Sequence, residues 1–285
     1  MKNHKILFVG LNTIDLMFLL PFYPASNTKT KAMRHQAAVG GPASNAAVTA
    51  AYLGAEAELF TPIGEHSLAA YVRDDFQRRG VRVFDPVANR EWAPVFASIV
   101  TSAEQGDRTV ISYHPDDRLE SSHAIYLDCT PYRAALFDSF HLEAAIPIAK
   151  RCREAGVLTV LDGGSWKPNL EGLLPYIDVA VCSADFSAPT GKGREAVFGY
   201  LRSHGVSMAA ITRGERSILF GTDSGVGEVP VPAVKAVDTL GAGDVFHGAV
   251  AFYLASGLTF DAALAEAAEV AARSCTSFGT RDWML

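Results

Sequence analysis

The chain has 285 residues, of which 49% are hydrophobic and 20% charged, so it can bury a full core and is not intrinsically disordered. Its formal net charge is −6 at pH 7, and no block rich in lysine and arginine stands out, which argues against a nucleic-acid-binding surface. The four cysteines are widely spaced and form no C-x-x-C pair, which indicates a reducing compartment. The apolar run Lys5–Gly10 is too short for a signal peptide, and no run approaches the roughly 20 apolar residues of a membrane span. We therefore expect a cytoplasmic protein with no membrane or nucleic-acid partner.

The first third of the chain predicts strands and helices separated by one irregular segment. A buried strand, a segment rich in aromatic residues and prolines, an Ala-rich helix, a second strand and an amphipathic helix are expected at 5–10, 15–36, 46–53, 58–62 and 68–79. Pro42 near the start of the Ala-rich helix and Gly54 just past its end are typical helix boundaries. An apolar residue at every fourth position from Leu68 to Phe76 defines the amphipathic helix.

The middle of the chain has a different character. Residues 94–101 and 108–113 are β-rich runs on either side of the polar segment 104–107, and this pattern predicts a hairpin. We expect the hairpin to pair with the segment after Asp15 and to form a small separate sheet.

The rest of the chain alternates strands and helices. Strands are expected at 134–138, 157–162, 178–182, 207–212, 217–220 and 229–231, and helices at 144–154, with Pro147 in the first turn, 243–256 and 260–277. This alternation predicts an α/β fold whose mostly parallel sheet is covered by helices on both faces.

The most informative segment is VDTLGAGDVFHG, at 237–248. Gly241 and Gly243 let the backbone approach a ligand closely, and the helix that follows presents free N–H groups and the positive end of its dipole. Such a turn is suited to binding a phosphate. Because the carboxylate of Asp244 repels phosphate, it points instead to a base that takes a proton from an attacking hydroxyl. The alternative is that Asp244 only stabilises the helix dipole.

Two motifs resemble those of the ribokinase-like (PfkB-type) carbohydrate kinase family. Residues 238–244, DTLGAGD, match the C-terminal motif of that family at every fixed position, and residues 40–45, GGPASN, match the N-terminal one. The motifs occur in the family's order, and the resemblance covers essentially the whole chain. It implies a ribokinase-like three-layer α/β/α sandwich with a mostly parallel central sheet. The main domain would comprise 1–12, 37–91 and 116–285, and a small β-sheet lid would comprise 13–36 and 92–115.

Within the family, residues 74–81, 107–110 and 237–244 resemble those of ketohexokinases, and residues 159–163 and 243–248 resemble those of sulfofructose kinases. The resemblance implies an ATP-dependent sugar kinase that transfers the γ-phosphoryl group of ATP to a hydroxyl of a ketohexose-like or related sugar. A nucleoside kinase of the same fold and a non-catalytic sugar- or nucleotide-binding regulator are the alternatives.

The resemblance also implies roles for individual residues. Asp244 would be the catalytic base, and the backbone amides of Gly241, Ala242 and Gly243 would form the anion hole for the transferred phosphoryl group. The residues implied to bind the sugar are Asp15, Gly41 and Asn45, with Asn27 and Lys29 in the lid. A cationic Lys29 would favour an anionic or phosphorylated sugar. Taken alone, Asp15 is typical of a turn, Asn45 of a first helix turn and Lys29 of a solvated surface.

The residues implied to bind the nucleotide are Arg108, Thr212, Gly214, Thr239, Gly241 and Gly243. Arg108 would reach from the small sheet towards the phosphates, although an arginine in a hairpin is usually solvated. Thr212 and Gly214 correspond to a T-x-G segment near the nucleotide, which an ordinary strand exit would also explain.

The resemblance implies Mg²⁺ together with ATP. Several members use an N-x-x-E motif to organise Mg²⁺, but Ser183–Phe186 replaces it here, so no protein ligand is assigned. K⁺ is implied near Asp238 and Gly279, and a homodimer is expected through the lid. Pro42 stands where ketohexokinase-like chains have asparagine. Phe140 stands where sulfofructose kinases have arginine, which argues against a sulfonated sugar.

Overall fold

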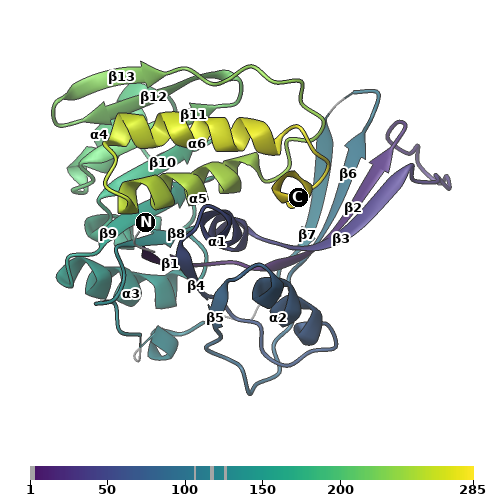
Figure 1. Ribbon diagram of the computed structural model, residues 1–285, viewed down its shortest axis with the longest axis horizontal. Helices are drawn as coiled ribbons and strands as arrows, with labels where there is room; N and C mark the ends of the chain where they lie inside the picture. Colours follow the sequence, from purple (N-terminus) through teal and green to yellow (C-terminus); the bar gives the residue numbers. More distant parts are fainter. Residues whose placement is uncertain (1–3, 106, 116–118, 125–126) are drawn as a thin grey trace.

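A computed structural model describes residues 4–105, 107–115, 119–124 and 127–285. Within this described part, nine strands form the central sheet in the order β13-β12-β11-β10-β9-β8-β1-β4-β5 (Figure 1). They are β1 (Lys5–Val9), β4 (Glu56–Phe60), β5 (Arg82–Phe84), β8 (Ala134–Phe137), β9 (Leu158–Gly163), β10 (Val179–Ser183), β11 (Met208–Arg213), β12 (Arg216–Thr222) and β13 (Gly225–Val229). Neighbouring strands from β5 to β11 pair in parallel, whereas β12 and β13 add antiparallel pairs at one edge.

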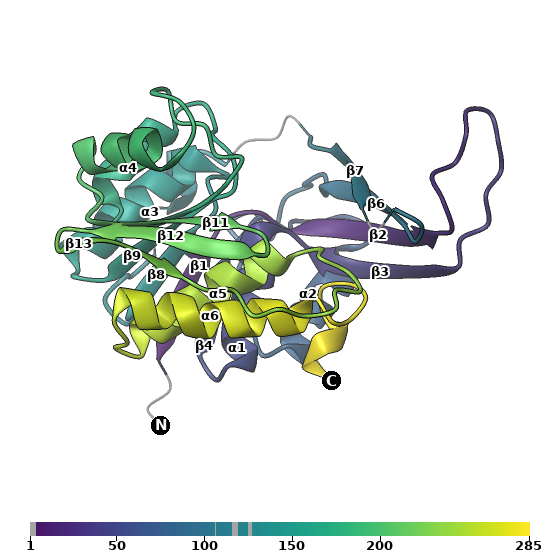
Figure 2. The same cartoon turned by 90° about the horizontal axis from the view of Figure 1, so that it is seen from above.

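Helices cover both faces of this sheet, as Figure 2 shows. One face carries α1 (Pro42–Tyr52), α2 (Ala69–Arg78), α5 (Ala242–Ala255) and α6 (Phe260–Ser274), and the other carries α3 (Leu142–Glu154) and α4 (Arg194–Ser203). Short 3₁₀ turns lie at Ser121–Ala124, Leu170–Gly172, Leu174–Tyr176 and Asp282–Met284. Each helix layer packs its own hydrophobic cluster against the sheet. The expected α/β/α sandwich with a mostly parallel sheet is therefore confirmed.

A second sheet of four strands projects from the main body (Figure 1). Its order is β3-β2-β6-β7, from β2 (Thr13–Leu20), β3 (Arg34–Gly40), β6 (Phe96–Ser102) and β7 (Arg108–Tyr113). The hairpin β6–β7 pairs with β2, as the sequence predicted. The proposed lid boundary at residue 116 falls within 116–118, which lie outside the described residues.

Some elements differ from the sequence-based expectations. The segment 15–36 contains most of β2 and the start of β3. β2 has no regular polar–apolar alternation, because its residues from Leu16 to Leu20 are all apolar although Leu16 is 38% exposed. β5 and α4 were not predicted. Helix α3 begins at Leu142, so Pro147 lies in its second turn and not in its first as predicted. The amides of Ala144 and Ala145 both donate to the carbonyl of His141, which places the helix start there.

No helix in the described part of the chain combines the length and the apolar composition needed to cross a membrane.

Helices α1 and α5 approach each other unusually closely. A side-chain carbon added at Gly248 of α5 would overlap the backbone of Ala46 in α1, so only glycine fits without a shift. Ala46 follows Asn45 in α1, and Gly248 lies one turn after Asp244 in α5. The close packing therefore sets the first turns of the two helices side by side.

We expect Gly248→Ala to lower the free energy of unfolding by about 1–3 kcal/mol, because the new methyl group forces α1 and α5 apart. The matched control is Gly199→Ala in α4, where an added carbon meets open space. That change should stabilise the protein by up to about 1 kcal/mol through higher helix propensity. Urea unfolding of both variants measures the difference, and equal behaviour would contradict the packing constraint.

Candidate active site

Gly241 turns the chain into helix α5. Its φ of 71° and ψ of 4° lie in the left-handed region that glycine adopts without strain. The first helical turn then presents Ala242, Gly243 and Asp244. The amide of Ala242 makes a long hydrogen bond of 3.3 Å to the carbonyl of Thr239. The turn thus directs the positive end of the helix dipole at the space in front of it.

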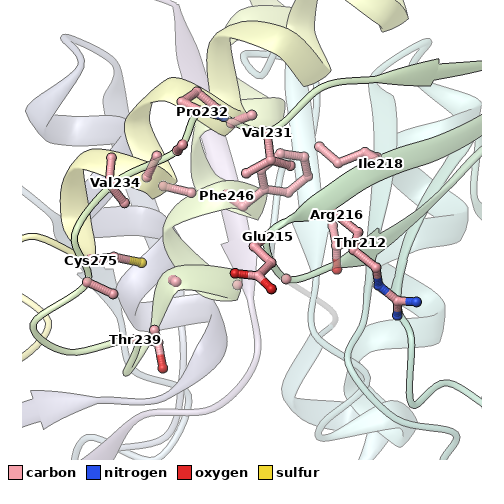
Figure 3. Close-up of a pocket in the computed structure, with 18 of the residues that line it drawn as sticks. Thr212, Glu215, Arg216, Ile218, Val231, Pro232, Val234, Thr239, Phe246 and Cys275 are labelled. Atoms are coloured by element: carbon pink, nitrogen blue, oxygen red, sulfur yellow. The ribbon is translucent and has the colours of Figure 1, made fainter. Parts of the chain in front are cut away.

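A cleft of about 890 Å³ opens beside this turn (Figure 3). Figure 3 shows Phe246, Val231 and Ile218 gathered at one end and Thr239 at the other. The predicted nucleotide residues Arg108, Thr212, Gly214, Thr239 and Gly243 all line the cleft, and Gly241 precedes the lining residue Ala242. An apolar end for a base and an end with helix amides for phosphates fit a nucleoside triphosphate.

Arg108 connects the small sheet to the cleft. It is the first residue of β7, and its Nη1 donates a 2.6 Å hydrogen bond to Oγ1 of Thr239. A cation from the small sheet therefore stands at the edge of the cleft, close to the start of α5.

The predicted sugar residues Asp15, Gly41 and Asn45 lie next to Asp244. Asn45 Nδ2 donates a 2.7 Å hydrogen bond to Oδ2 of Asp244, and Gly41 caps the helix that carries Asn45. Burial raises the pKa of Asp15 to about 6; the Thr13 hydroxyl, which donates to it at 2.6 Å, opposes the rise and the charge of Asp244 adds to it. The structure thus gathers these side chains at one buried point, where the cleft meets the small sheet.

Asn27 and Lys29 are not part of this group. Both lie exposed in the loop between β2 and β3, which extends beyond the end of the small sheet (Figure 2). Within one chain, Lys29 therefore lies away from the group around Asp244.

Asp138 is a site residue that the sequence analysis missed. It follows β8, is 4% exposed, and accepts hydrogen bonds from the amides of Leu11 (2.8 Å), Ala43 (3.0 Å) and Phe140 (3.0 Å). Burial raises the pKa of Asp138 to about 6, while these three hydrogen bonds act against the rise. Its carboxyl group joins the end of β1 to the start of α1 and so positions Gly41 and Asn45.

Asp162 and His247 form a second buried group that sequence reasoning did not identify. His247 Nδ1 lies 2.6 Å from the carbonyl of Gly243 and 3.4 Å from Oδ2 of Asp162, and its Nε2 lies 3.0 Å from the carbonyl of Val181. Carbonyl oxygens only accept, so an imidazolium with two N–H donors satisfies both. Burial raises the pKa of Asp162 to about 7, and the charge of His247 opposes this rise. His247 thus contacts the first turn of α5 through the carbonyl of Gly243, and Asp162 lies beside the same imidazole ring.

Arg281 is a further residue that the sequence analysis missed. It is 2% exposed, and it donates from Nη1 to Oδ1 of Asn45 at 2.7 Å and from Nη2 to the carbonyl of Val39 at 2.9 Å. Burial lowers the pKa of Arg281 to about 10, although nearby carboxylates oppose the fall. A buried guanidinium therefore stands directly behind the Asn45–Asp244 hydrogen bond.

The residues implied to bind K⁺ lie together behind the glycine-rich turn. Asp238 is buried and accepts from the amides of Leu240 and Gly279, both at 2.9 Å, so the proposed K⁺-site residues are in contact. In the part of the chain that the structure describes, no three His, Cys, Asp or Glu side chains cluster as a metal site would require. Asp185, in the segment that replaces N-x-x-E, is exposed.

The missed residues differ in the signal they leave in the sequence. Asp138 and Asp162 each come at the carboxyl end of an apolar run, where ligand-binding residues of parallel sheets gather. That pattern was available and could have identified both. Arg281 has no such pattern around it.

A ribokinase-like α/β fold, a cleft of nucleotide size and a carboxylate at a helix N-terminus together define a phosphotransferase. A model of the pfkB family of carbohydrate kinases matches residues 3–284, and the chain belongs to this family. It is therefore an ATP-dependent kinase of sugars or nucleosides.

Several known proteins are similar over nearly the whole chain. Mouse ketohexokinase is 25% identical over 291 residues, covering 96% of this chain and 97% of its own length. Mouse ribokinase is 26% identical over 294 residues, covering 97% of this chain and 90% of its own. The solved structure of Arabidopsis thaliana ribokinase, complexed with ribose and ATP, has a TM-score of 0.74 at 18% identity and covers 97% of this chain and 94% of its own. At that identity the solved structure establishes the fold.

The raised pKa of Asp15 generates a stability prediction. A carboxyl group with a raised pKa in the folded state favours folding at low pH, and this contribution is lost as pH rises from about 4 to about 6. Asp15→Asn keeps an acceptor for Thr13 and removes the buried charge. We expect it to stabilise the unliganded protein by about 1–3 kcal/mol at pH 7.5 and to have no effect near pH 4.

Urea unfolding across this pH range measures the effect. Asp223→Asn is the control, because its carboxylate is largely exposed. If the difference in unfolding free energy between Asp15→Asn and the parent is the same at every pH, the raised pKa of Asp15 is contradicted.

Proposed function

We propose that this chain transfers the γ-phosphoryl group of ATP to a hydroxyl of a ketohexose-like sugar. The observation that carries the proposal is the position of Asp244. It lies at the N-terminus of α5, where the nucleotide-sized cleft meets the buried group of Asp15, Gly41 and Asn45. A base at this junction can reach an acceptor on one side and a phosphate on the other.

Asp244 acts as the general base. Burial raises its pKa, whereas the Asn45 hydrogen bond and the charges of His247 and Arg281 lower it, so the carboxylate stays available without being tightly paired. The acceptor hydroxyl gives its proton to Asp244, its oxygen forms the new bond to phosphorus, and the bond to ADP breaks. The amides of Gly241–Gly243 stabilise the charge on the transferred group.

ATP brings the phosphoryl group, and we propose that Mg²⁺ arrives bound to it. Mg²⁺ usually keeps several waters and binds substrate phosphates with few protein ligands. This suits a chain in which Ser183–Phe186 replaces N-x-x-E. No side chain is assigned to the ion.

The charges of the pocket favour a neutral, hydroxyl-rich acceptor. Asp15 and Asp244 face the proposed sugar position, and the buried cation Arg281 already donates to Asn45. A carboxylate such as Asp15 accepts hydrogen bonds from two hydroxyls. Phe140 itself supplies no charge for a sulfonate; its ring stacks on His114 with ring centroids 5.9 Å apart, and Lys167 Nζ lies 4.6 Å from the centroid of the Phe140 ring. An acidic sugar bound as tightly as its neutral analogue would contradict this proposal.

We further propose that the small sheet is a lid and forms a homodimer. Val110, Ile111 and Tyr113 of β7 expose more than half of their surface, and a second copy of the sheet would cover them. In such a dimer the loop with Asn27 and Lys29 is free to approach the other chain's pocket. Lid closure would exclude water, which competes as an acceptor. A monomer in sedimentation analysis at micromolar concentration would contradict the dimer.

The catalytic assignment is tested by ADP release with Mg-ATP and K⁺ across ketoses, aldoses, acidic sugars and nucleosides. We expect a ketose to stimulate release, and Asp244→Asn to reduce the rate by about 100- to 10,000-fold, because the base is lost while the shape is kept. Asp223→Asn serves as the control.

An Asp244→Asn enzyme as fast as the parent would contradict the mechanism. Stimulation by nucleosides alone would replace the sugar with a nucleoside. ATP binding with no turnover of any acceptor would favour the regulator alternative.

A monovalent-cation effect is the remaining prediction of function. The carboxylate of Asp238 accepts from the amide of Leu240, which precedes the Gly241–Gly243 turn, and from the amide of Gly279. An ion bound to Asp238 would therefore stabilise that turn. We expect turnover to be faster in K⁺ than in Na⁺ or a large organic cation. Equal rates in all three would show that no such ion is used.

A further inference from the structure

Arg281 occupies an unusual place for an arginine. It follows α6 in the C-terminal segment, which Figure 1 shows beside α1 and the base of the small sheet. Its neighbour Thr280 contacts Gly241, since a carbon added at that glycine would lie 2.8 Å from the Thr280 methyl group. The segment is therefore packed directly against the anion turn and the acceptor pocket.

Among the described residues, the guanidinium of Arg281 makes no direct ion pair with a carboxylate. In the described part of the chain, its hydrogen bonds go to Asn45 and to the carbonyl of Val39, and its buried Nε has no partner. Asp75, Asp15 and Asp244 are the carboxylates that act on its charge. Burying a guanidinium without a paired carboxylate costs free energy of folding, so its hydrogen bonds indicate a role in the site.

The bond to Asn45 determines how that amide is oriented. Arg281 has only donors, so the oxygen of Asn45 must face it and the NH₂ group must face Asp244. A flipped amide would set NH₂ against the guanidinium and oxygen against the carboxylate. Arg281 therefore decides that Asn45 donates to Oδ2 of Asp244.

We propose that Arg281 is a positioning residue for the phosphoryl transfer, acting through Asn45 to hold Oδ2 of Asp244 so that Oδ1 receives the acceptor proton. This inference rests on the proposed function of Asp244. The charge of Arg281 also favours the ionised form of Asp244, which is the form that can accept a proton.

Other charges surround Asp244 and would persist when Arg281 is changed. The cations are His247 of α5 and Arg108 of β7. The acids are Asp15 of β2, Asp138 after β8 and Asp162 of β9. The two cations favour the ionised carboxylate, whereas the three acids oppose it. Removing Arg281 therefore leaves a pocket in which the acids weigh more.

The first test follows the ionisation of Asp244 and needs no acceptor. The carboxyl carbon of Asp244 is observed by NMR in the whole protein with ¹³C-labelled aspartate, and is assigned by its loss in Asp244→Asn. We expect Arg281→Gln to raise the titration midpoint by about one pH unit or more, and Arg281→Lys, which keeps the charge, to leave it nearly unchanged. An unchanged midpoint in Arg281→Gln would overturn the charge effect.

The second test uses the acceptor that the parent enzyme turns over, so a missing parent activity would count against the proposed function and not against Arg281. We expect Arg281→Lys to lower kcat at least tenfold with KM for ATP within twofold, because a single ammonium cannot hold both Asn45 and Val39. In an Asn45→Ala background the same change should have almost no further effect on kcat.

This second test uses the charge-retaining lysine variant, so it stands even where Arg281→Gln fails to fold. Independent, multiplying effects of Arg281→Lys and Asn45→Ala would overturn the proposal, because they would show that Arg281 does not act through Asn45.

Discussion

The hydrogen bond between Asn45 and Asp244 joins two segments that are 199 residues apart in the chain. It lies where α1 and α5 pack closely, with no room for a side chain at Gly248, so that their first turns lie side by side. Each first turn is held in place by further contacts. Asp138 ties the start of α1 to the end of β1, and His247 braces the carbonyl of Gly243 in α5. The proposed acceptor position and the cleft of nucleotide size meet where these turns meet.

The same geometry buries several charges at one place. Asp15, Asp138 and Asp162 all have raised pKa values because water is excluded, and Asp244 shares this environment. Such groups weaken the folded state at neutral pH. They persist at sites where a bound substrate or a reaction uses them. Buried carboxylates of this kind favour the folded state most when they are protonated or accept hydrogen bonds from hydroxyls.

Much of the fold could be predicted from the sequence, because its strands and helices carry clear periodic patterns. Helices α5 and α6 and strand β7 lie close to or at their expected positions. The segment 15–36 was not resolved into β2 and β3, since the continuous apolar run from Leu16 to Leu20 carries no alternating pattern although Leu16 is exposed.

The two halves of the site differed in how well the sequence revealed them. The glycine-rich turn at 241–244 pointed to the residues around Asp244, and Asp15, Gly41 and Asn45 do lie next to it. Asp138 and Asp162 were overlooked although both end apolar strands. Arg281 depends on a contact with Asn45, 236 residues away, that no local pattern encodes. Asn27 and Lys29 lie in an exposed loop away from the residues around Asp244, and no local pattern in the sequence shows this.

The most direct test of the account is a crystal structure of the protein with a non-hydrolysable ATP analogue and the acceptor that it phosphorylates. The account predicts that the reacting hydroxyl lies within about 3.2 Å of Asp244 and faces the terminal phosphate, which contacts the amides of the Gly241–Gly243 turn. A hydroxyl bound away from Asp244, with another side chain in reach of its proton, would contradict the central claim.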